Sequence, residues 1–271
     1  MMRALYTAAS GMRAQQTNVD NISNNIANVN TTAFKSQKTE FKSLLYQTIQ
    51  TRTTSANGEE KPIGAQVGLG TRVASNTTSY TQGALLEDES KSAFAIEGNG
   101  FFQVRGADGT TYYTRNGNFN WSIGPTGTTL TNTDGYPVLD SNGNTIVLPN
   151  NVNSEKAVVT TDGQVGYYNN AGAYVSMNRT IGLSQFNNPA GLEKAGSNLL
   201  RATNASGAAL NEATNANLTR SKVLNKYLEG SNVNVADEMV NLIVAQRAYQ
   251  LNSKAITTSD DMLEQANNLK R

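Results

Sequence analysis

The stretch that decides the fold is Leu5 to Phe34, LYTAASGMRAQQTNVDNISNNIANVNTTAF. Most positions that lie seven residues apart in it are apolar, and a second set follows three residues after the first, as in the a and d positions of a coiled coil. The first set is Leu5, Met12, Val19, Ile26 and Ala33, and the second is Ala8, Gln15, Ile22 and Val29. This spacing predicts a helix that is buried along one narrow stripe against another helix.

The same stretch is rich in asparagine, which disfavours a helix that stands alone. Its six Asn residues are Asn18, Asn21, Asn24, Asn25, Asn28 and Asn30. Each costs about 0.6 kcal/mol relative to Ala in a helix, whereas the burial of each large apolar side chain returns about 1.5–3 kcal/mol. We therefore expect the helix to form only when its stripe is covered, and we interpret the stretch as an assembly element.

The other end of the chain offers a partner for this stripe. Ser231 to Arg271 contains neither Gly nor Pro, and Asn234 or Ser231 can cap a helix that has Asp237 in its first turn. A continuous helix over this span would be about 55 Å long. It carries two apolar seams: Met239, Leu242, Tyr249, Ile256 and Leu263 form one, and Val244, Ala248, Leu251, Ala255, Met262 and Leu269 form the other. A helix apolar over so wide an arc contacts more than one neighbour, although two helices that close an ordinary monomeric core are the plain alternative.

Composition excludes several classes of function. The formal net charge is +1, which gives no electrostatic footprint for nucleic acid. Cysteine and histidine are both absent, so thiol nucleophiles, disulfides, and thiolate or imidazole metal sites are excluded. The chain has no run of 18 apolar residues, which a membrane span would require, and the N-terminus lacks the apolar segment of a secretory signal. We expect no cofactor and no metal, and a protein that stays in the cytoplasm or leaves it without a cleaved signal peptide.

The middle of the chain is predicted to be β. Six turn dipeptides lie between runs of β-branched and aromatic residues, which is typical of antiparallel hairpins; they begin at Asn99, Asp108, Asn116, Asp134, Asn142 and Asp162. Before them, Lys35, Lys38 and Lys42 at helical spacing predict a short amphipathic helix up to Ile49, and residues 51–70 predict an extended connector.

Candidate chemistry is weak throughout the chain. Asp140 to Asn144 resembles the start of a calcium loop, but its Gly is in the wrong position, and a hairpin turn explains it better. The adjacent carboxylates at Glu87 to Glu89 and at Asp260 and Asp261 cannot flank a scissile bond as a glycosidase requires. We therefore expect no catalysis. A secreted β-rich adhesin or glycan-binding module with a helical stalk is the alternative, with Trp121, Tyr112 and Tyr113 as its aromatic platform.

Two long motifs at the termini resemble the axial proteins of the bacterial flagellum, the rod and hook family. The first is Leu5-x-x-Ala8-Ala9-x-Gly11-Met12-x-Ala14-Gln15-Gln16, followed by Asn24-Asn25-Ile26-Ala27-Asn28-Val29-Asn30-Thr-Thr-x-Phe34-Lys35. The second is Ser231-Asn232-Val233-Asn234-Val235-Ala-x-Glu238-Met239-Val240, followed by Gln246-Arg247-Ala248-Tyr249 and Asn252-Ser253-Lys254-Ala255. Internal motifs such as Gly64-x-Gln66-Val67-Gly68-x-Gly70 are similar to the distal-rod branch. Two positions depart from the family pattern: Ala93 stands where Asp is usual, and Ala33 where Gly is frequent.

The resemblance implies a structural subunit of a helical tube that transmits motor torque. Its implied partners are further copies of itself, proximal rod and hook proteins, the flagellar export apparatus and, where an outer membrane is present, bushing rings. The expected fold class is α+β, with long N- and C-terminal helices that pack as a coiled-coil-like pair around an inserted, mainly antiparallel β domain. The expected domains are 1–34 plus 231–271 for helical assembly, 35–90 plus 218–230 as an extended connector and β region, and 91–217 as a β-rich outer domain.

The expected subunit interface follows the seams of both helices. It comprises Leu5, Met12, Val19, Ile22, Ile26, Val29, Met239, Leu242, Val244, Tyr249, Leu251, Ile256, Met262 and Leu263.

Overall fold

The computed structural model describes residues 2–50, 64–124, 127–149, 152–169, 172–215 and 217–269. The fold is α+β, and the chain divides into two compact units. We call residues 1–27, 37–78 and 234–271 the helical unit, and residues 28–36 and 79–233 the β unit. Most of the connector expected at 51–70 lies outside the described residues.

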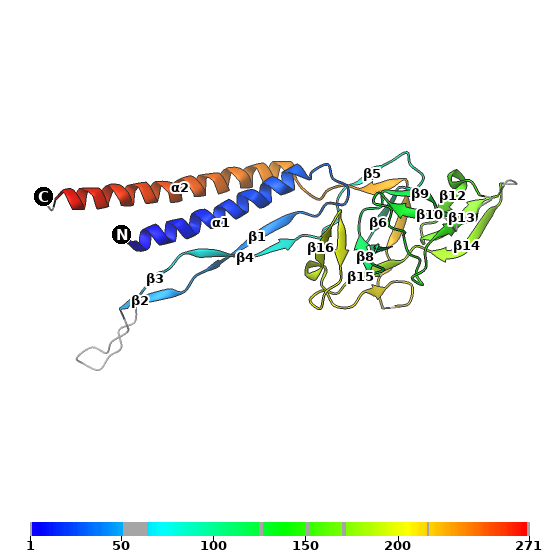
Figure 1. The fold of residues 1–271 in the computed structure, drawn as a ribbon, viewed down its shortest axis with the longest axis horizontal. Helices are drawn as coiled ribbons and strands as arrows, with labels where there is room; N and C mark the ends of the chain where they lie inside the picture. The colour runs from blue at the N-terminus through cyan, green and yellow to red at the C-terminus, as the bar shows by residue number, and fades with distance from the viewer. Residues whose placement is uncertain are drawn as a thin grey trace, which may run out of the picture. The chain divides into compact units, whose positions relative to one another are not determined.

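The helical unit contains two long helices and a β ribbon. Helix α1 lies between helix α2 and the ribbon (Figure 1), and it contacts both. The ribbon is antiparallel and continues into a second two-stranded segment. The bounds are α1 Met2–Ala27, β1 Gln37–Ser43, β2 Tyr46–Gln50, β3 Ala65–Gly68, β4 Thr71–Thr78 and α2 Val235–Asn268.

Helix α2 begins as its sequence predicts. The side chain of Asn234 accepts a hydrogen bond from the backbone N–H of Ala236 at 3.1 Å, and Asp237 and Glu238 lie in the first turn. The cap satisfies a backbone donor that has no partner within the helix, and the two carboxylates favour the positive end of the helix dipole. The expected Asn234 cap is confirmed.

Helix α1 is shorter than the heptad pattern predicts. It ends at Ala27, so Val29 and Ala33 are not on the helix. A turn follows, in which the N–H of Thr31 donates to the carbonyl of Asn28. Ala33 has φ +57°, in the left-handed region that costs an L-residue about 1–2 kcal/mol, and its N–H donates to the carbonyl of Glu229 at 2.7 Å. The tertiary contact therefore holds Ala33 in a conformation for which glycine is the usual residue.

The amphipathic helix expected from Lys35 to Ile49 is wrong. This segment forms β1 and β2. Thr39 on β1 accepts a hydrogen bond from Asn21 of α1, and Gln37 exchanges two hydrogen bonds with Asn25. Lysines three and four residues apart suggested a helix, but strand pairing with β4 and these bonds to α1 determine the backbone instead.

The β unit is built from short strands in several small sheets. The largest sheet has six strands in the order β16-β17-β8-β7-β15-β18, and two three-stranded sheets have the orders β11-β10-β9 and β12-β13-β14. Two further pairs are β19-β6 and β20-β5. Every strand pairing between the described residues is antiparallel, as predicted.

The strand bounds of the β unit are β5 Leu85–Glu87, β6 Phe94–Glu97, β7 Phe101–Arg105, β8 Thr111–Thr114, β9 Phe119–Gly124, β10 Gly127–Asn132, β11 Val147–Leu148, β12 Ala157–Val159, β13 Gln164–Tyr168, β14 Tyr174–Thr180, β15 Leu183–Gln185, β16 Glu193–Gly196, β17 Leu199–Arg201, β18 Leu210–Asn211, β19 Lys222–Asn225 and β20 Tyr227–Glu229. Short 3₁₀ helices span Ser154–Lys156 and Pro189–Gly191.

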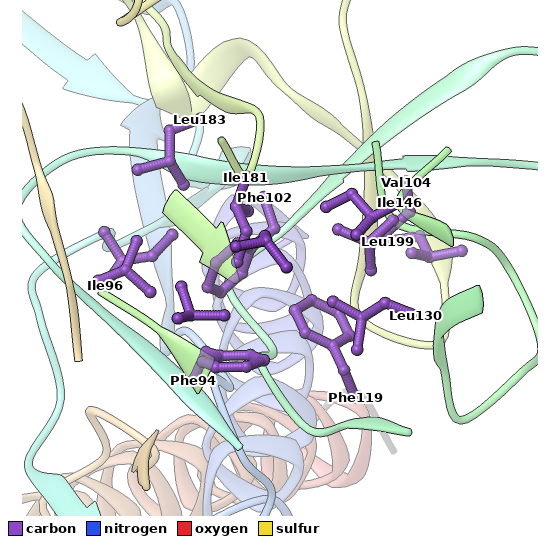
Figure 2. Close-up of a cluster of buried hydrophobic side chains, with 14 residues drawn as sticks. Phe94, Ile96, Phe102, Val104, Phe119, Leu130, Ile146, Ile181, Leu183 and Leu199 are labelled. Atoms are coloured by element: carbon purple, nitrogen blue, oxygen red, sulfur yellow. The ribbon is translucent and has the colours of Figure 1, made fainter. Parts of the chain in front are cut away.

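The β unit has a dense apolar core. Figure 2 shows Phe94, Phe102, Phe119 and Leu130 converging from strands β6, β7, β9 and β10. All four are at most 1% exposed, and the Phe102 and Phe119 rings meet edge to face at 5.1 Å between centroids. A second cluster consists of five buried residues, among them Phe101 and Phe186. Burial at this density is that of a self-sufficient domain.

Four of the six predicted turns join strands or bridges that pair with each other. These are the turns at Asp108, Asp134, Asn142 and Asp162, where the following glycine has φ between +76° and +84°. The dipeptides that begin at Asn99 and Asn116 do not close hairpins, because β6 pairs with β19 and β9 with β10. The strand partners at those two positions depend on residues far apart in the chain, which a dipeptide does not specify.

Candidate functional site

Helices α1 and α2 meet along a seam of small and polar residues. Of the buried residues on the two helices, only Ile22 has a large apolar side chain. The set is Ala8, Gly11, Ala14, Ile22 and Asn25 on α1, and Glu238, Ala245 and Ser259 on α2. We call this set, with Asn18 and Asn252, the polar seam. It buries little apolar area, so it contributes little hydrophobic free energy to the pairing of the helices.

Asn25 connects three elements of the helical unit. Its side-chain N–H₂ donates to the carbonyl of Gln37 on β1 at 2.8 Å and to Oε1 of Glu238 on α2 at 3.1 Å, and its oxygen accepts from the N–H of Gln37 at 2.9 Å. Asn25 is fully buried. A buried polar group that is satisfied in only one arrangement specifies register, so Asn25 fixes α1 against both α2 and β1.

Gly11 permits a close approach of the two helices. A Cβ atom at this position would lie 2.9 Å from Nδ2 of Asn252 on α2, which is closer than real side chains come. A larger residue at this position would require the Asn252 side chain to move, so Gly11 leaves room for that side chain between the helices. The polar seam therefore combines steric and hydrogen-bond constraints.

The large apolar side chains of α2 lie outside the polar seam. Leu251 is 70% exposed, Val244 62% and Met239 55%. Other exposed members are Val235, Val240, Ile243, Tyr249, Met262, Leu263 and Leu269. We call these ten residues the open face of α2. Exposed apolar side chains in this number on one helix mark an interaction site.

The structure divides the fourteen residues of the expected interface into three groups. Those on the open face are Met239, Val244, Tyr249, Leu251, Met262 and Leu263. Those half-buried in the chain are Leu5, Met12, Val19, Ile26, Val29, Leu242 and Ile256, and Ile22 is buried. Sequence reasoning missed Gly11, Asn25, Glu238 and Asn252. A signal for them existed, because Gly11, Asn18 and Asn25, like Glu238, Ala245, Asn252 and Ser259, recur every seven residues.

A hollow of about 350 Å³ opens where the open face meets α1. It is lined by Gln16 and Val19 of α1 and by Gln246, Tyr249 and Gln250 of α2. Its volume is comparable to that of one or two large side chains, so it can receive apolar groups from another helix.

The β unit contains a buried ion cluster. Oε1 of Glu229 accepts from Nζ of Lys35 at 2.5 Å and from the N–H of Gly83 at 3.0 Å, and Oε2 of Glu229 lies 3.1 Å from Nε of Arg115. Arg115 also donates to the carbonyls of Gly98 and Gly100. Burial lowers the pKa of Lys35 and of Arg115, and the charge of Glu229 opposes that shift. With all its polar contacts inside the β unit, the cluster ties residues 28–36 and 79–84 to strand β20.

The turn at Asp140 and the aromatic residues of the expected platform are both part of the fold of the β unit. Oδ1 of Asp140 accepts from the N–H groups of Asn142 and Asn144 at 2.8 Å each, which is the predicted hairpin turn. Tyr113 is buried, and Trp121 and Tyr112 pack against the core. In the described part of the chain, no three His, Cys, Asp or Glu side chains gather in a way that could hold a metal. None of the described helices is long and apolar enough to cross a membrane.

Exposed apolar side chains on a two-helix unit, together with a β unit that has a core of its own, are typical of a structural assembly protein. Three family models match the chain: flagella basal body rod protein over residues 5–35, flagellar hook protein FlgE/F/G D1 domain over 95–167, and flagellar basal body rod FlgEFG protein C-terminal over 224–269.

Relatives match the whole chain. The flagellar basal-body rod protein FlgG of Borreliella burgdorferi is 42% identical to it over 100% of both chains. The FlgG protein of Agrobacterium fabrum is also 42% identical, over 96% of this chain and 97% of the relative. The FlgG protein of Bacillus subtilis is 39% identical over 100% of both chains. The chain belongs to the family of the flagellar basal-body rod protein FlgG. It is a structural rod protein rather than an enzyme, and no finding supports the adhesin alternative.

Proposed function

We propose that the chain is the subunit of the distal flagellar rod and that it self-assembles through α1 and α2 into a helical tube that carries torque from the motor to the hook. The observation that carries this proposal is the division of α2 into a polar seam toward α1 and an open face. A single chain leaves the open face without cover. Further copies of the chain are the partners that would cover it, because a non-closing contact between different surfaces of identical subunits generates a filament.

The two helices pair in a coiled-coil-like manner in this proposal. Seven-residue spacing of the polar seam on both helices supports the pairing, since that spacing keeps one stripe of each helix facing the other. The polar seam sets the register of the two helices within a chain, and the expected interface residues that lie on the open face supply the hydrophobic free energy between chains. This arrangement separates specificity from affinity.

The remaining parts of the proposal concern neighbours and place. The tube would meet proximal rod proteins at one end and hook proteins at the other, within the basal body. Family membership supports both. We further propose that the subunit passes through the flagellar export apparatus before assembly, with the terminal segments 1–34 and 231–271 unfolded. The poor helix propensity of the asparagines in α1 supports this, because the energetic cost is recovered only on assembly.

The test replaces an apolar residue of the open face with a charge. Met239→Asp should abolish filament formation in concentrated protein, observed by electron microscopy, because a buried carboxylate at a subunit interface has no partner. Trp121 is the chain's only tryptophan and packs in the β unit, so its fluorescence during urea titration should show that the β unit of the variant unfolds as in the wild type. Asn241→Asp, on an exposed position of α2, adds the same charge without removing apolar surface and is the matched control.

Normal filaments from Met239→Asp would contradict the proposal. The unfolded-termini part has its own test, which is limited proteolysis of dilute protein. Rapid cleavage within 1–27 and 234–271, the parts of these termini that belong to the helical unit, with an intact β unit, is the expected result. Resistance of both termini would show that the helical unit folds without assembly.

A further inference from the structure

The outer face of the β1–β4 ribbon carries two basic side chains with no partner among the described residues. Lys42 of β1 lies directly opposite Arg72 of β4 in the antiparallel register, and both are exposed. Residues that face each other across two strands project to the same side, and like charges in this position destabilise the ribbon. Neither residue takes part in any of the four ion pairs found between described residues.

The nearest acidic side chain in the strand sequence does not neutralise this pair. Glu40 lies two residues before Lys42, but its carboxylate accepts hydrogen bonds from Thr77 Oγ1 at 2.9 Å and from Ser75 Oγ at 3.2 Å. The ribbon beyond Lys42 also exposes apolar groups, of which Leu45 is 81% and Tyr46 62% exposed. A basic pair next to exposed apolar side chains describes a surface suited to an acidic, apolar partner.

The last turns of α2 present the complementary charge. Asp260, Asp261 and Glu264 are all exposed, and no Lys or Arg lies three or four residues from any of them. Asp260 and Glu264 are four residues apart, where like charges destabilise a helix by about 0.2–0.5 kcal/mol. Met262 and Leu263 of the open face lie between these carboxylates in sequence. This segment is therefore acidic and apolar, as the ribbon's partner must be.

The two surfaces do not meet within one chain. Helix α1 lies between α2 and the ribbon (Figure 1), and Ser10 of α1 accepts a hydrogen bond from the N–H of Thr71, the neighbour of Arg72. None of the ion pairs between described residues joins the two surfaces. No described residue of the same chain compensates either surface, which leaves another molecule as the partner of each.

We propose that the Lys42–Arg72 pair of one copy docks on the Asp260–Asp261–Glu264 segment of a second copy. The proposal rests on the self-assembly proposed above and identifies an electrostatic contact within it, separate from the hydrophobic contacts of the open face. Opposite charge on two otherwise unpaired surfaces of the same chain is the argument for a second copy. The contact removes two sets of like-charge repulsion at once and orients the subunits as they associate.

The experiment measures the critical concentration for filament formation at low salt. Lys42→Glu and Asp261→Lys, as separate variants, should each raise it about three- to ten-fold, because each replaces an attraction with a repulsion. The double variant Lys42→Glu with Asp261→Lys should return toward the wild-type value, since the reversed charges attract again. Lys38→Glu is the matched control, as an exposed lysine on the same strand opposite uncharged Thr77, and should have a smaller effect.

Salt supplies a second readout. The differences between the variants should largely disappear at 1 M salt, where the screening length is about 3 Å. If wild-type filaments form and the double variant is no better than either single variant, this contact is wrong while self-assembly stands. If the wild type forms no filaments under any condition, the self-assembly proposal fails first.

Discussion

The two units of the chain bury opposite kinds of residue. In the β unit, phenylalanines and branched aliphatic residues fill the core, and the one large group of buried charges is internally paired. In the helical unit, small and polar residues fill the seam, while Leu251, Val244 and Met239 are exposed. Hydrophobic burial is the dominant favourable term in folding. The β unit therefore has its own source of stability, whereas the polar seam supplies little of this term to the helical unit.

The largest expected effect concerns the ion cluster of the β unit. Glu229→Gln removes the carboxylate that is paired with the buried cations of Lys35 and Arg115, which should lower the free energy of unfolding by about 3–5 kcal/mol. Urea titration followed by Trp121 fluorescence measures this. The control is Glu193→Gln, which removes one partner of the exposed pair with Arg201 and should cost less than about 1 kcal/mol. Equal losses in the two variants would contradict the assignment of a buried, paired cluster.

A matched pair of leucine truncations compares the units directly. Leu130→Ala removes a fully buried side chain from the β core and should destabilise the β unit by about 2–5 kcal/mol, through lost transfer energy and the cavity that remains. Leu251→Ala makes the same chemical change on the open face and should alter the stability of the dilute monomer by no more than about 0.5 kcal/mol.

Leu251→Ala should affect assembly, although it leaves the stability of the monomer nearly unchanged. The critical concentration for filament formation should rise for this variant, and sedimentation of polymer at graded protein concentrations measures it. An unchanged critical concentration would remove Leu251 from the interface.

Tyr80 predicts an alkaline loss of stability in the β unit. Its ring packs edge to face on Phe101 at 5.7 Å between centroids, and burial raises the pKa of its hydroxyl to about 12 from its ordinary value of 10.0. Between these two pH values the unfolded chain releases the proton and the folded chain keeps it, so stability falls as pH rises from 10 to about 12. Because solvent reaches part of the ring, the loss should be about 1–2 kcal/mol.

Tyr80→Phe isolates this contribution. The difference in unfolding free energy between the variant and the wild type, measured at pH 9 and again at pH 11.5, cancels the titration of every other group. The difference should move in favour of the variant at the higher pH. A constant difference would show that the Tyr80 hydroxyl is as solvated in the folded as in the unfolded state.

The smallest expected effect is local strain at Lys226. This exposed residue has φ +64°, which costs about 1–2 kcal/mol for a side chain that is not glycine. Lys226→Gly relieves that strain but adds about 0.5–1 kcal/mol of backbone entropy cost, so the β unit should gain about 0.5 kcal/mol. Lys222→Gly, an exposed position on strand β19 outside the positive-φ set, should instead lose about that amount. Thermal unfolding of the two variants side by side provides the measurement.

Sequence periodicity identified the long terminal helices, and turn chemistry identified an antiparallel β region. Both are local properties, because a heptad or a dipeptide such as Asp108-Gly109 acts within a few residues. Residues 35–90 were expected to be an extended connector and β region, but the lysine spacing up to Ile49 suggested a helix there, because the strand signal depends on pairing with β4. The polar seam was missed for a related reason: apolar residues were taken as the pairing stripe, although Gly11, Asn25, Glu238 and Asn252 recur with the same spacing.

The sequence alone determined that the chain is an α+β protein with two helices at its ends, with neither histidine nor cysteine for catalysis, and with far more apolar helix surface than one partner can cover. It also limited the helix start to Asn234 or Ser231, since a cap is a contact between near neighbours, and the structure shows Asn234 as the cap. Only the tertiary structure decided which stripe of each helix faces the other, where α1 ends, and that Lys35 is paired with Glu229. Each of these depends on residues far apart in the chain, and their contacts exist only after folding brings them together.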